Sequence, residues 1–172
     1  MDLKYKYFLF FLSFSDLYSN SQLDNRGYIV KLGDSAPDFT TILTTGEKIK
    51  LSNLKGSVVV LQFTASWCSV CRIEMPHLEK DIWKRYKDKN LVLIGIDRDE
   101  PLKIVVDFKK EMGITYPIGL DLGAEIFSLY AEKNSGVTRN VVIDKEGKIV
   151  FLTRLFKETE YQKMIKKIES IL

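Results

Sequence analysis

Cysteine and histidine are scarce in this chain. Its 172 residues contain two cysteines, Cys68 and Cys71, and one histidine, His77. A zinc site built from cysteine and histidine needs about four ligands at suitable spacing, and no second cysteine pair is present to supply them. A disulfide between Cys68 and Cys71 would close a very short loop and stabilise the fold little. Neither a metal site nor a structural cross-link is therefore the favoured interpretation of this pair.

The chain also lacks an apolar run long enough to cross a bilayer, which takes about 20 residues. An apolar stretch at 7–14 reads Tyr-Phe-Leu-Phe-Phe-Leu-Ser-Phe and follows Lys4 and Lys6. A basic start followed by a short apolar run is typical of a secretory signal. We therefore predict a signal or targeting segment at 1–20, with a docked N-terminal segment as the alternative. No stable membrane span is expected in the mature chain.

This signal predicts that the protein is periplasmic or otherwise exported. Its cleavage region is weak, because the nearest small pair, Ser13 and Ser15, is followed by Asp16. The polar, irregular stretch at 21–32 is interpreted as a linker and 33–172 as one folded domain. Export would place the cysteine pair in an oxidising compartment, where only a dedicated electron supply keeps it reduced.

Strong charge of either sign is absent, which argues against nucleic acid as a partner. The formal net charge is +3, and the basic residues are scattered along the chain. Apolar residues make up 45% and charged residues 28% of the sequence, an ordinary globular composition. At 172 residues the chain suits a single domain with a sizeable core.

The stretch that organises the chain surrounds the cysteine pair. An apolar run of strand length at 58–63 leads through a short turn into Trp67 and Cys68, and a helical pattern begins at once. Backbone N–H groups and the positive end of the helix dipole then face the Cys68 sulfur and stabilise its thiolate, the reactive form. Cys71 follows one turn later, so the spacing supplies an attacking and a resolving thiol. A redox-active pair is the favoured interpretation.

Three motifs carry a resemblance to a known family. Trp-Cys-Ser-Val-Cys-Arg-Ile-Glu-Met-Pro at 67–76 resembles the active site of TlpA/ResA-like thiol:disulfide oxidoreductases, in the thioredoxin superfamily. Gly-Asp-Ser-Ala-Pro-Asp-Phe at 33–39 is similar to the opening of that domain, and Ile-Asp-Lys-Glu-Gly-Lys-Ile at 143–149 to its late hairpin. The resemblance implies an enzyme that exchanges disulfides with protein thiols, without a cofactor. It favours a reductase role, with a membrane thiol reductant as electron donor.

The order of elements predicts an α/β fold, and the resemblance implies that the domain at 33–172 is thioredoxin-like. Hairpins are expected at 39–51 and at 140–153, and buried strands at 58–63 and 91–96. A block at 101–131 supplies a helix, a short strand and a second short helix. The expected result is a central mixed β-sheet flanked by helices, with an N-terminal β-hairpin and an inserted αβα block.

Some details of the helices are also predicted. Pro76 lies inside the first helical pattern and is expected to kink it. Leu102 and Val106 are expected on the buried face of the helix that starts near Pro101. His77 is interpreted as a helix-surface residue.

The resemblance assigns roles around the cysteines. Cys68 is expected to attack a target disulfide, and Cys71 to resolve the mixed disulfide. Glu74 matches the acidic residue of the family motif, which implies an influence on proton transfer or on the thiol pKa values; a solvent-facing carboxylate is the alternative. Gln62 stands where thioredoxin has a buried Asp, so a proton relay through that carboxylate is absent. Trp67 is expected to contact the substrate beside the sulfur, or merely to pack.

Two other functions fit the same fold. Peroxiredoxins share the opening and the late hairpin, but Leu61 and Ala65 replace the Pro and Thr of their Pro-x-x-x-Thr-x-x-Cys site. A copper carrier would bind Cu(I) through soft thiolates. Carriers that resemble this chain use a wider cysteine spacing and a distant histidine, whereas His77 lies on the cysteine helix. Both functions are kept as alternatives to the oxidoreductase.

Proline is absent after Pro117, which departs from the family. Thioredoxin-like folds place a cis-proline against the Cys-x-x-Cys, and that position falls here at Thr138. A cis bond before a non-proline residue costs roughly 3–4 kcal/mol, so a trans bond after Val137 is predicted. Thr138 is still expected near the Cys68 sulfur. Together with Trp67 and Arg139 it is a candidate substrate contact, and Arg139 either adds positive charge by turning inward or points to solvent.

Overall fold

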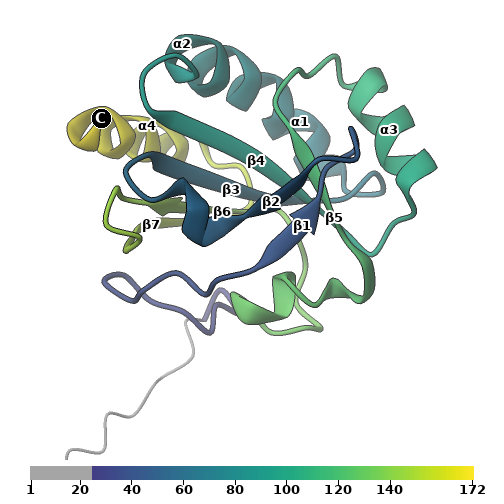
Figure 1. The fold of residues 1–172 in the computed structure, drawn as a ribbon, viewed down its shortest axis with the longest axis horizontal. Coiled ribbons are helices and arrows are strands. Elements are labelled where there is room, and N and C mark those ends of the chain that lie inside the picture. The colour runs from purple at the N-terminus through teal and green to yellow at the C-terminus, as the bar shows by residue number, and fades with distance from the viewer. Residues whose placement is uncertain (1–24) are drawn as a thin grey trace, which may run out of the picture.

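The computed structural model describes residues 25–172, and its central sheet has five strands in the order β5-β4-β3-β6-β7 (Figure 1). The strands are β3 Val58–Thr64, β4 Leu91–Arg98, β5 Ile118–Asp121, β6 Arg139–Ile143 and β7 Ile149–Arg154. β3, β4 and β5 run parallel, whereas β6 is antiparallel to both β3 and β7. The predicted mixed sheet of a thioredoxin-like fold is therefore confirmed. The signal expected at 1–20 lies outside the described residues.

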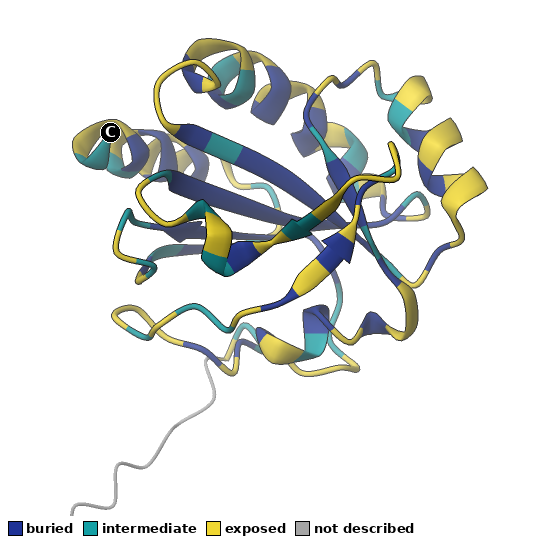
Figure 2. Ribbon diagram, viewed as in Figure 1, coloured by how far each residue is buried: buried dark blue, intermediate teal, exposed yellow. Residues whose placement is uncertain are grey.

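The middle of the sheet is built from apolar runs that are covered on both faces. All seven residues of β3 are buried, as are all five of β6. Figure 2 shows the central strands buried and the outer faces of the helices exposed. Runs of this kind favour interior strands over the half-exposed strands that alternate apolar and polar residues. β3 thus ends, at the cysteine motif, in a rigid part of the molecule.

A short antiparallel hairpin, β1 Thr40–Ile42 and β2 Lys48–Lys50, precedes the sheet and confirms the first predicted hairpin. It is followed by a 3₁₀ turn, η1 Leu51–Leu54. The hairpin docks on β5, where the Thr41 hydroxyl donates to the Leu120 carbonyl at 2.9 Å. Gly119 makes this close approach possible, because a Cβ there would lie 2.5 Å from Thr41 Oγ1.

The helix that follows Cys68 changes its geometry after Pro76. α1 Ser69–His77 continues into a π-helical segment, η2 Leu78–Trp83, and then into α2 Lys84–Tyr86. Proline has no backbone N–H, so one hydrogen bond of the helix is missing at this point. The irregularity expected at Pro76 therefore takes the form of a wider turn, which places the Glu79 side chain inside the protein.

The inserted block contains one regular helix, α3 Leu102–Glu111, and two 3₁₀ turns, η3 Leu122–Ala124 and η4 Phe127–Leu129. α3 buries Val105 and Phe108, but Leu102 and Val106 are exposed, so the predicted inner face was wrong for these two. The last helix of the block is reduced to turns, because Gly123 and Ala124 have positive φ angles, which interrupt a right-handed helix. After this interruption the Asp121 carboxylate accepts from the Ile126 and Phe127 N–H groups, both at 2.8 Å.

The terminal segments complete the packing. α4 Glu158–Ile171 lies against β7 and beside α1, where the His77 ring stacks on Phe156 at 4.9 Å (Figure 1). Part of the segment expected as a linker packs on the domain, since Tyr28 is buried and its hydroxyl donates to the Thr153 carbonyl at 2.6 Å. Within residues 25–172 no helix has the length and apolar character needed to cross a membrane.

Candidate functional site

Cys68 and Cys71 lie where β3 passes into α1. Cys68 is the N-cap of α1, and its Sγ accepts the Cys71 N–H at 3.1 Å. The two cysteines form a disulfide with their Cα atoms 5.3 Å apart. Cys68 keeps 7% of its surface exposed and Cys71 none. An incoming thiol or disulfide therefore meets Cys68 first, at the positive end of the helix.

The loop before Cys68 is held by Glu100, an acidic residue that was not among the predicted site residues. Glu100 accepts from both the backbone N–H and the hydroxyl of Ser66, each at 2.6 Å. The Ser66 carbonyl accepts from Arg72 Nε at 2.9 Å. Glu100 follows the end of β4 and Ser66 the end of β3, so the two meet at one edge of the sheet. Trp67, next in the loop, is 63% exposed beside the disulfide.

A second acid, Asp97, lies at the end of β4 beneath this loop. Its side chain is buried, and burial together with the negative charge of Glu100 raises its pKa to about 8. The ordinary aspartate pKa is near 4. Burial and the charge of Glu100 thus favour the protonated form of Asp97 near neutral pH.

Thr138 touches both sulfur atoms. Its Oγ1 is 3.1 Å from Cys68 Sγ and 3.0 Å from Cys71 Sγ, and in the disulfide only the hydroxyl has a hydrogen to donate. The Val137–Thr138 bond is cis, so the predicted trans bond was wrong. The carbonyls on both sides of this bond accept from Arg154 Nη1, at 3.1 and 3.4 Å. These partners come from the end of β7 and could not be read from the local sequence.

Arg139 turns into the domain and does not point to solvent. It is fully buried, its Nε donates to the Gly136 carbonyl at 3.1 Å, and its guanidinium lies 4.7 Å from the centre of the Tyr28 ring. Such stacking is a favourable cation–π arrangement. The positive charge therefore sits behind the Thr138 loop, on the side facing the segment that contains Tyr28.

Glu74 is buried beneath the disulfide, and only 1% of its surface is exposed. Its Oε1 accepts from Asn140 Nδ2 at 2.7 Å, and its Oε2 accepts from Gln62 Nε2 at 3.3 Å. Burial raises the pKa of Glu74 to about 7, although both amide donors act to lower it. The alternative of a solvent-facing carboxylate is therefore wrong. Glu74 and Cys71 are both buried residues of α1, one helical turn apart.

Sequence reasoning selected some of these residues and missed others. Cys68, Cys71, Trp67, Glu74 and Thr138 come together around the disulfide. Three residues that complete the surroundings of Glu74 were missed: Tyr116, Asn140 and Thr153. The available signal was a row of polar residues in otherwise apolar strands, because Gln62 pairs with Asn140 and Asn140 with Thr153 across the sheet.

His77 takes no part in this site. It lies at the far end of α1, stacks on Phe156 and is 3.7 Å from Asp81. Within residues 25–172 no group of three or more His, Cys, Asp or Glu side chains is arranged to hold a metal ion.

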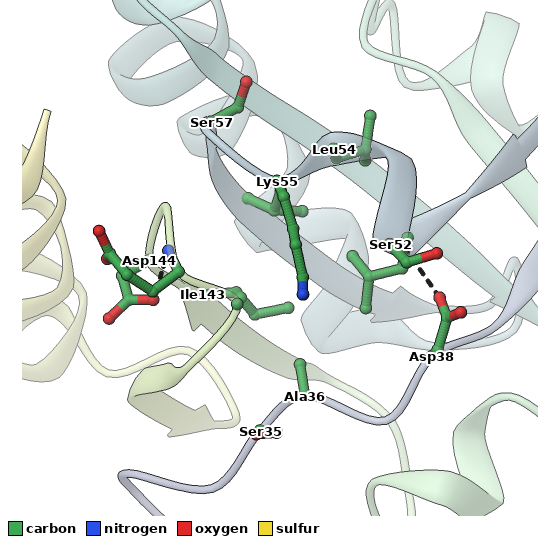
Figure 3. Close-up of a pocket in the computed structure, with 13 residues that line it drawn as sticks. Ser35, Ala36, Asp38, Ser52, Leu54, Lys55, Ser57, Ile143 and Asp144 are labelled. Carbon is green, nitrogen blue, oxygen red and sulfur yellow. Dashed lines mark hydrogen bonds between the residues drawn. The ribbon is translucent and has the colours of Figure 1, made fainter.

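A separate hollow opens at the other end of β3 (Figure 3). It is lined by the start of β3, the η1 turn and the β6–β7 turn, and Lys55 reaches into it. The Asp38 carboxylate beside it accepts the Ser52 N–H at 2.9 Å. This hollow contains none of the predicted site residues, so the chemistry of the cysteines lies elsewhere.

Comparison with known proteins gives concordant matches. The sequence model of the AhpC/TSA family matches residues 32–152. The chain is 34% identical over 121 residues to the thiol-disulfide oxidoreductase ResA of Bacillus cereus, covering 70% of this chain and 68% of that protein.

Two solved structures are also similar to this one. A candidate protein disulfide isomerase from Bacteroides thetaiotaomicron has a TM-score of 0.83 and 58% identity, over 85% of this chain and 92% of that one. A candidate thiol:disulfide interchange protein DsbE from Chlorobium tepidum has a TM-score of 0.74 and 27% identity, over 83% and 98%.

The contact of Thr138 with the sulfurs generates a prediction. Thr138→Val keeps the branched shape but removes the hydroxyl that can donate to a Cys68 thiolate in the reduced protein. A hydrogen bond to a charged group contributes about 1.5–3 kcal/mol, so alkylation of Cys68 near neutral pH should slow roughly tenfold. The rate is measured with a thiol alkylating reagent as a function of pH.

Thr64→Val is the matched control for this experiment, because the Thr64 hydroxyl lies 3.6 Å from the sulfur of Met75, which has no thiol. Cys68 alkylation should be unaltered in that variant. Equal alkylation rates in Thr138→Val and in the unaltered protein would contradict a role for this hydroxyl.

Proposed function

The chain belongs to the AhpC/TSA family and, within it, to the ResA-like thiol–disulfide oxidoreductases, and we propose that it reduces disulfides of exported proteins. The observation that carries this proposal is the asymmetry of the pair. Cys68, at the N-terminus of α1, keeps 7% of its surface exposed, whereas Cys71 is fully buried. An accessible nucleophile backed by an inaccessible resolving thiol is the arrangement that dithiol–disulfide exchange requires.

The proposed reaction moves two electrons from the protein to its substrate. The Cys68 thiolate attacks one sulfur of a substrate disulfide, whose other sulfur leaves as a thiolate and takes up a proton. Cys71 then loses its proton and attacks Cys68 Sγ, which releases the second substrate sulfur. The products are a reduced substrate and the Cys68–Cys71 disulfide. A thiol reductant, which we propose to be membrane-bound, returns the pair to the dithiol.

The first attack is assigned to Cys68 by its surroundings. The Cys71 N–H at 3.1 Å and the Thr138 hydroxyl at 3.1 Å both point to its sulfur. Donors to the charged form of a thiol lower its pKa and raise the thiolate fraction. Trp67 offers an exposed apolar surface beside the sulfur, which we propose as a contact for the substrate chain. Arg139 is buried, so the role proposed for it is electrostatic, through the Thr138 loop.

The Cys71→Ser variant tests this assignment. We predict that it accumulates mixed disulfides through Cys68, because the resolving thiol is absent and the covalent intermediate cannot be released. The reduced variant is mixed with an extract of exported proteins that contain disulfides, and the linkage is identified by mass spectrometry of the non-reduced peptides.

Cys68→Ser is the matched control, and it should trap nothing because Cys71 has no exposed surface. Efficient trapping by Cys68→Ser would overturn the order of attack. Peroxide consumption by the reduced protein is measured in the same preparations. A rapid turnover of peroxide would favour the peroxiredoxin alternative, although Leu61 and Ala65 occupy the positions of that site's Pro and Thr.

Glu74 is proposed to accept the proton that Cys71 loses. Both side chains lie on the buried face of α1, and a base acts best when its pKa is near the working pH. Burial brings the pKa of Glu74 to about 7, so the carboxyl can take up and release a proton near neutrality.

Glu74→Gln is predicted to slow exchange at neutral pH by at least roughly tenfold, because a positioned base is lost. The pH–rate curve should also lose the rise near pH 7 that belongs to Glu74. An unaltered curve in this variant would show that Glu74 is not the base. The measurement is the rate of disulfide reduction in a model substrate across this pH range.

Stability should respond in a defined direction. The folded-state pKa of about 7 lies above the ordinary value of 4.5, so the unaltered protein loses stability as pH rises through this interval. Glu74→Gln should lack this loss.

The direction of electron flow is proposed to be reductive. A buried carboxylate near the pair disfavours a second negative charge, and this weakens the thiolate form relative to the disulfide. We therefore predict a reduction potential nearer to that of thioredoxin, about −270 mV, than to that of DsbA, about −120 mV. The reduction potential is measured by equilibrating the protein with glutathione or dithiothreitol redox buffers. A value near that of DsbA would make the protein an oxidant.

Export is proposed from the N-terminal sequence, which lies outside the described residues. Lys4, Lys6 and the apolar stretch at 7–14 support a cleaved signal. Fractionation of cells that make the full chain should recover a product shorter than 172 residues outside the cytoplasm. Recovery of a full-length cytoplasmic product would contradict this part of the proposal. Replacing Lys4 and Lys6 with Glu serves as a matched control and should retain the precursor.

A further inference from the structure

A chain of hydrogen bonds runs through the centre of the sheet and passes through Glu74. The Tyr116 hydroxyl donates to Gln62 Oε1 at 2.7 Å, and Gln62 Nε2 donates to Glu74 Oε2 at 3.3 Å. On the other side, Asn140 Nδ2 donates to Glu74 Oε1 at 2.7 Å and to Thr153 Oγ1 at 2.9 Å. At most 3% of the surface of any of the five residues is exposed.

The register of the sheet places these groups side by side. Gln62 of β3 pairs with Asn140 of β6, and Asn140 pairs with Thr153 of β7. Paired residues on neighbouring strands point to the same face, so their side chains form one row under α1. Gly95 of β4 is the next member, and a Cβ there would lie 3.5 Å from the Tyr116 ring. Ile118 lies nearer still, with its Cγ1 3.1 Å from that Cβ, so both side chains pack over Gly95, and the Tyr116 hydroxyl reaches Gln62.

The Gln62 amide has two possible orientations, and each suits a different state of Glu74. With its NH₂ toward Glu74, the amide donates to an ionised carboxylate. With its carbonyl toward Glu74, it suits only the protonated acid, which alone has a hydrogen to donate. The Tyr116 hydroxyl donates to the carbonyl from the opposite side, and among the described residues Gln62 is its one hydrogen-bond partner. If the amide turned round, the hydroxyl could accept from the NH₂, but its own hydrogen would be left without an acceptor, so Tyr116 favours the first orientation.

We propose that Tyr116 is a positioning residue of this oxidoreductase, whose hydroxyl holds the Gln62 amide so that the ionised form of Glu74 is favoured. The inference rests on the proposed function of Glu74 as proton acceptor for Cys71, and it adds a residue that touches neither cysteine nor substrate. Tyr116 acts through Gln62 alone, because its hydroxyl is bonded to the amide and not to the carboxylate.

The backbone at Tyr116 is held by Glu79, a residue on the continuation of the helix that carries Cys71 and Glu74. Glu79, in the π-helical segment after α1, accepts from the backbone N–H of Thr115 at 2.9 Å and of Tyr116 at 3.4 Å. It also accepts from the Thr115 hydroxyl at 2.7 Å. The wider turn that follows Pro76 therefore places an anchor for Tyr116 on the element that bears Cys71 and Glu74.

The other groups that act on Glu74 are few among the described residues. Glu160, from α4, raises the pKa of Glu74 by its negative charge, and it pairs with Arg26 at 3.1 Å. Burial raises the phenol pKa values of Tyr28, Tyr116 and Tyr161, and the charge of Glu74 adds to this, so the three phenols remain protonated. From β3 and β6 the facing groups are the amides of Gln62 and Asn140, and from β7 the Thr153 hydroxyl. Cys71 on α1 is the remaining titratable neighbour.

Tyr116→Phe removes the hydroxyl and keeps the ring over Gly95. Gln62 then loses the donor that fixes its orientation, and the protonated form of Glu74 becomes more favourable. The pH–rate curve of disulfide reduction should move to higher pH by up to about one unit, which is the upper range of the effect of one neutral hydrogen bond such as that from Tyr116 to Gln62. The rate loss should be largest on the acidic side of the curve and should shrink as pH rises.

Tyr130→Phe is the matched control, since Tyr130 is equally buried and donates to the Pro37 carbonyl at 2.6 Å, away from Glu74. It should leave the position of the curve unaltered. The double variant Tyr116→Phe/Glu74→Gln should have the same pH profile as Glu74→Gln alone, because the effect passes through Glu74. A rate loss that is uniform in pH, or that persists in the double variant, would overturn the proposal and assign Tyr116 to packing.

A direct titration separates this inference from the proposed function. The ¹³C chemical shift of the Glu74 carboxyl carbon is followed against pH in the disulfide form of the unaltered protein and of Tyr116→Phe. An upward shift of the midpoint supports the role of Tyr116 whether or not Glu74 is the base in exchange. An unmoved midpoint overturns it. A Glu74→Gln variant that keeps the full pH–rate curve would instead overturn the proposed role of Glu74.

Discussion

Keeping a carboxyl group inside the sheet, beneath the cysteines, is the constraint on which the centre of this protein depends. A carboxylate removed from water is costly unless hydrogen-bond donors face it. The donors come from Gln62 and Asn140, which the register of β3 and β6 sets directly opposite each other. Their own remaining polar groups need partners in turn, and Tyr116 and Thr153 supply them. One buried acid thus accounts for polar side chains on three otherwise apolar strands.

The elements of the fold could be predicted from the sequence because each is marked by a local pattern. The apolar run into Trp67 and Cys68 identified β3 and the start of α1, and turn residues identified the hairpins. The predictions that failed are those that depend on tertiary contacts. Leu102 and Val106 have helical spacing but are exposed to solvent, and the helix expected at 123–131 is interrupted by the positive φ angles of Gly123 and Ala124. The burial of Glu74 depends on strands that the helix meets only in the fold.

Thr138 shows which features of the site could be predicted from the local sequence and which could not. Its proximity to the cysteines followed from its place before β6, and the structure has it in contact with both sulfurs. The cis conformation of the Val137–Thr138 bond could not be predicted from the local sequence. The groups that bond the Val137 and Thr138 carbonyls are the Arg154 side chain and the Leu155 N–H, which lie at the end of β7. Where this family has proline, which offers no donor, this chain offers a hydroxyl to the sulfurs. The difference lies in chemistry rather than in shape.

On the proposed mechanism, α1 carries two negative charges in the reduced protein, the Cys68 thiolate and the Glu74 carboxylate. Like charges on one helix oppose each other, so each has its own stabilising donors: the helix N-terminus and Thr138 for the sulfur, Gln62 and Asn140 for the carboxylate. The attack of Cys68 on the substrate removes the sulfur charge, and only afterwards does Cys71 lose its proton to Glu74. Once the Cys68–Cys71 disulfide has formed, no thiolate remains near the carboxyl. The donors from Gln62 and Asn140 favour the ionised carboxylate, so these hydrogen bonds set the pH at which Glu74 releases the proton again.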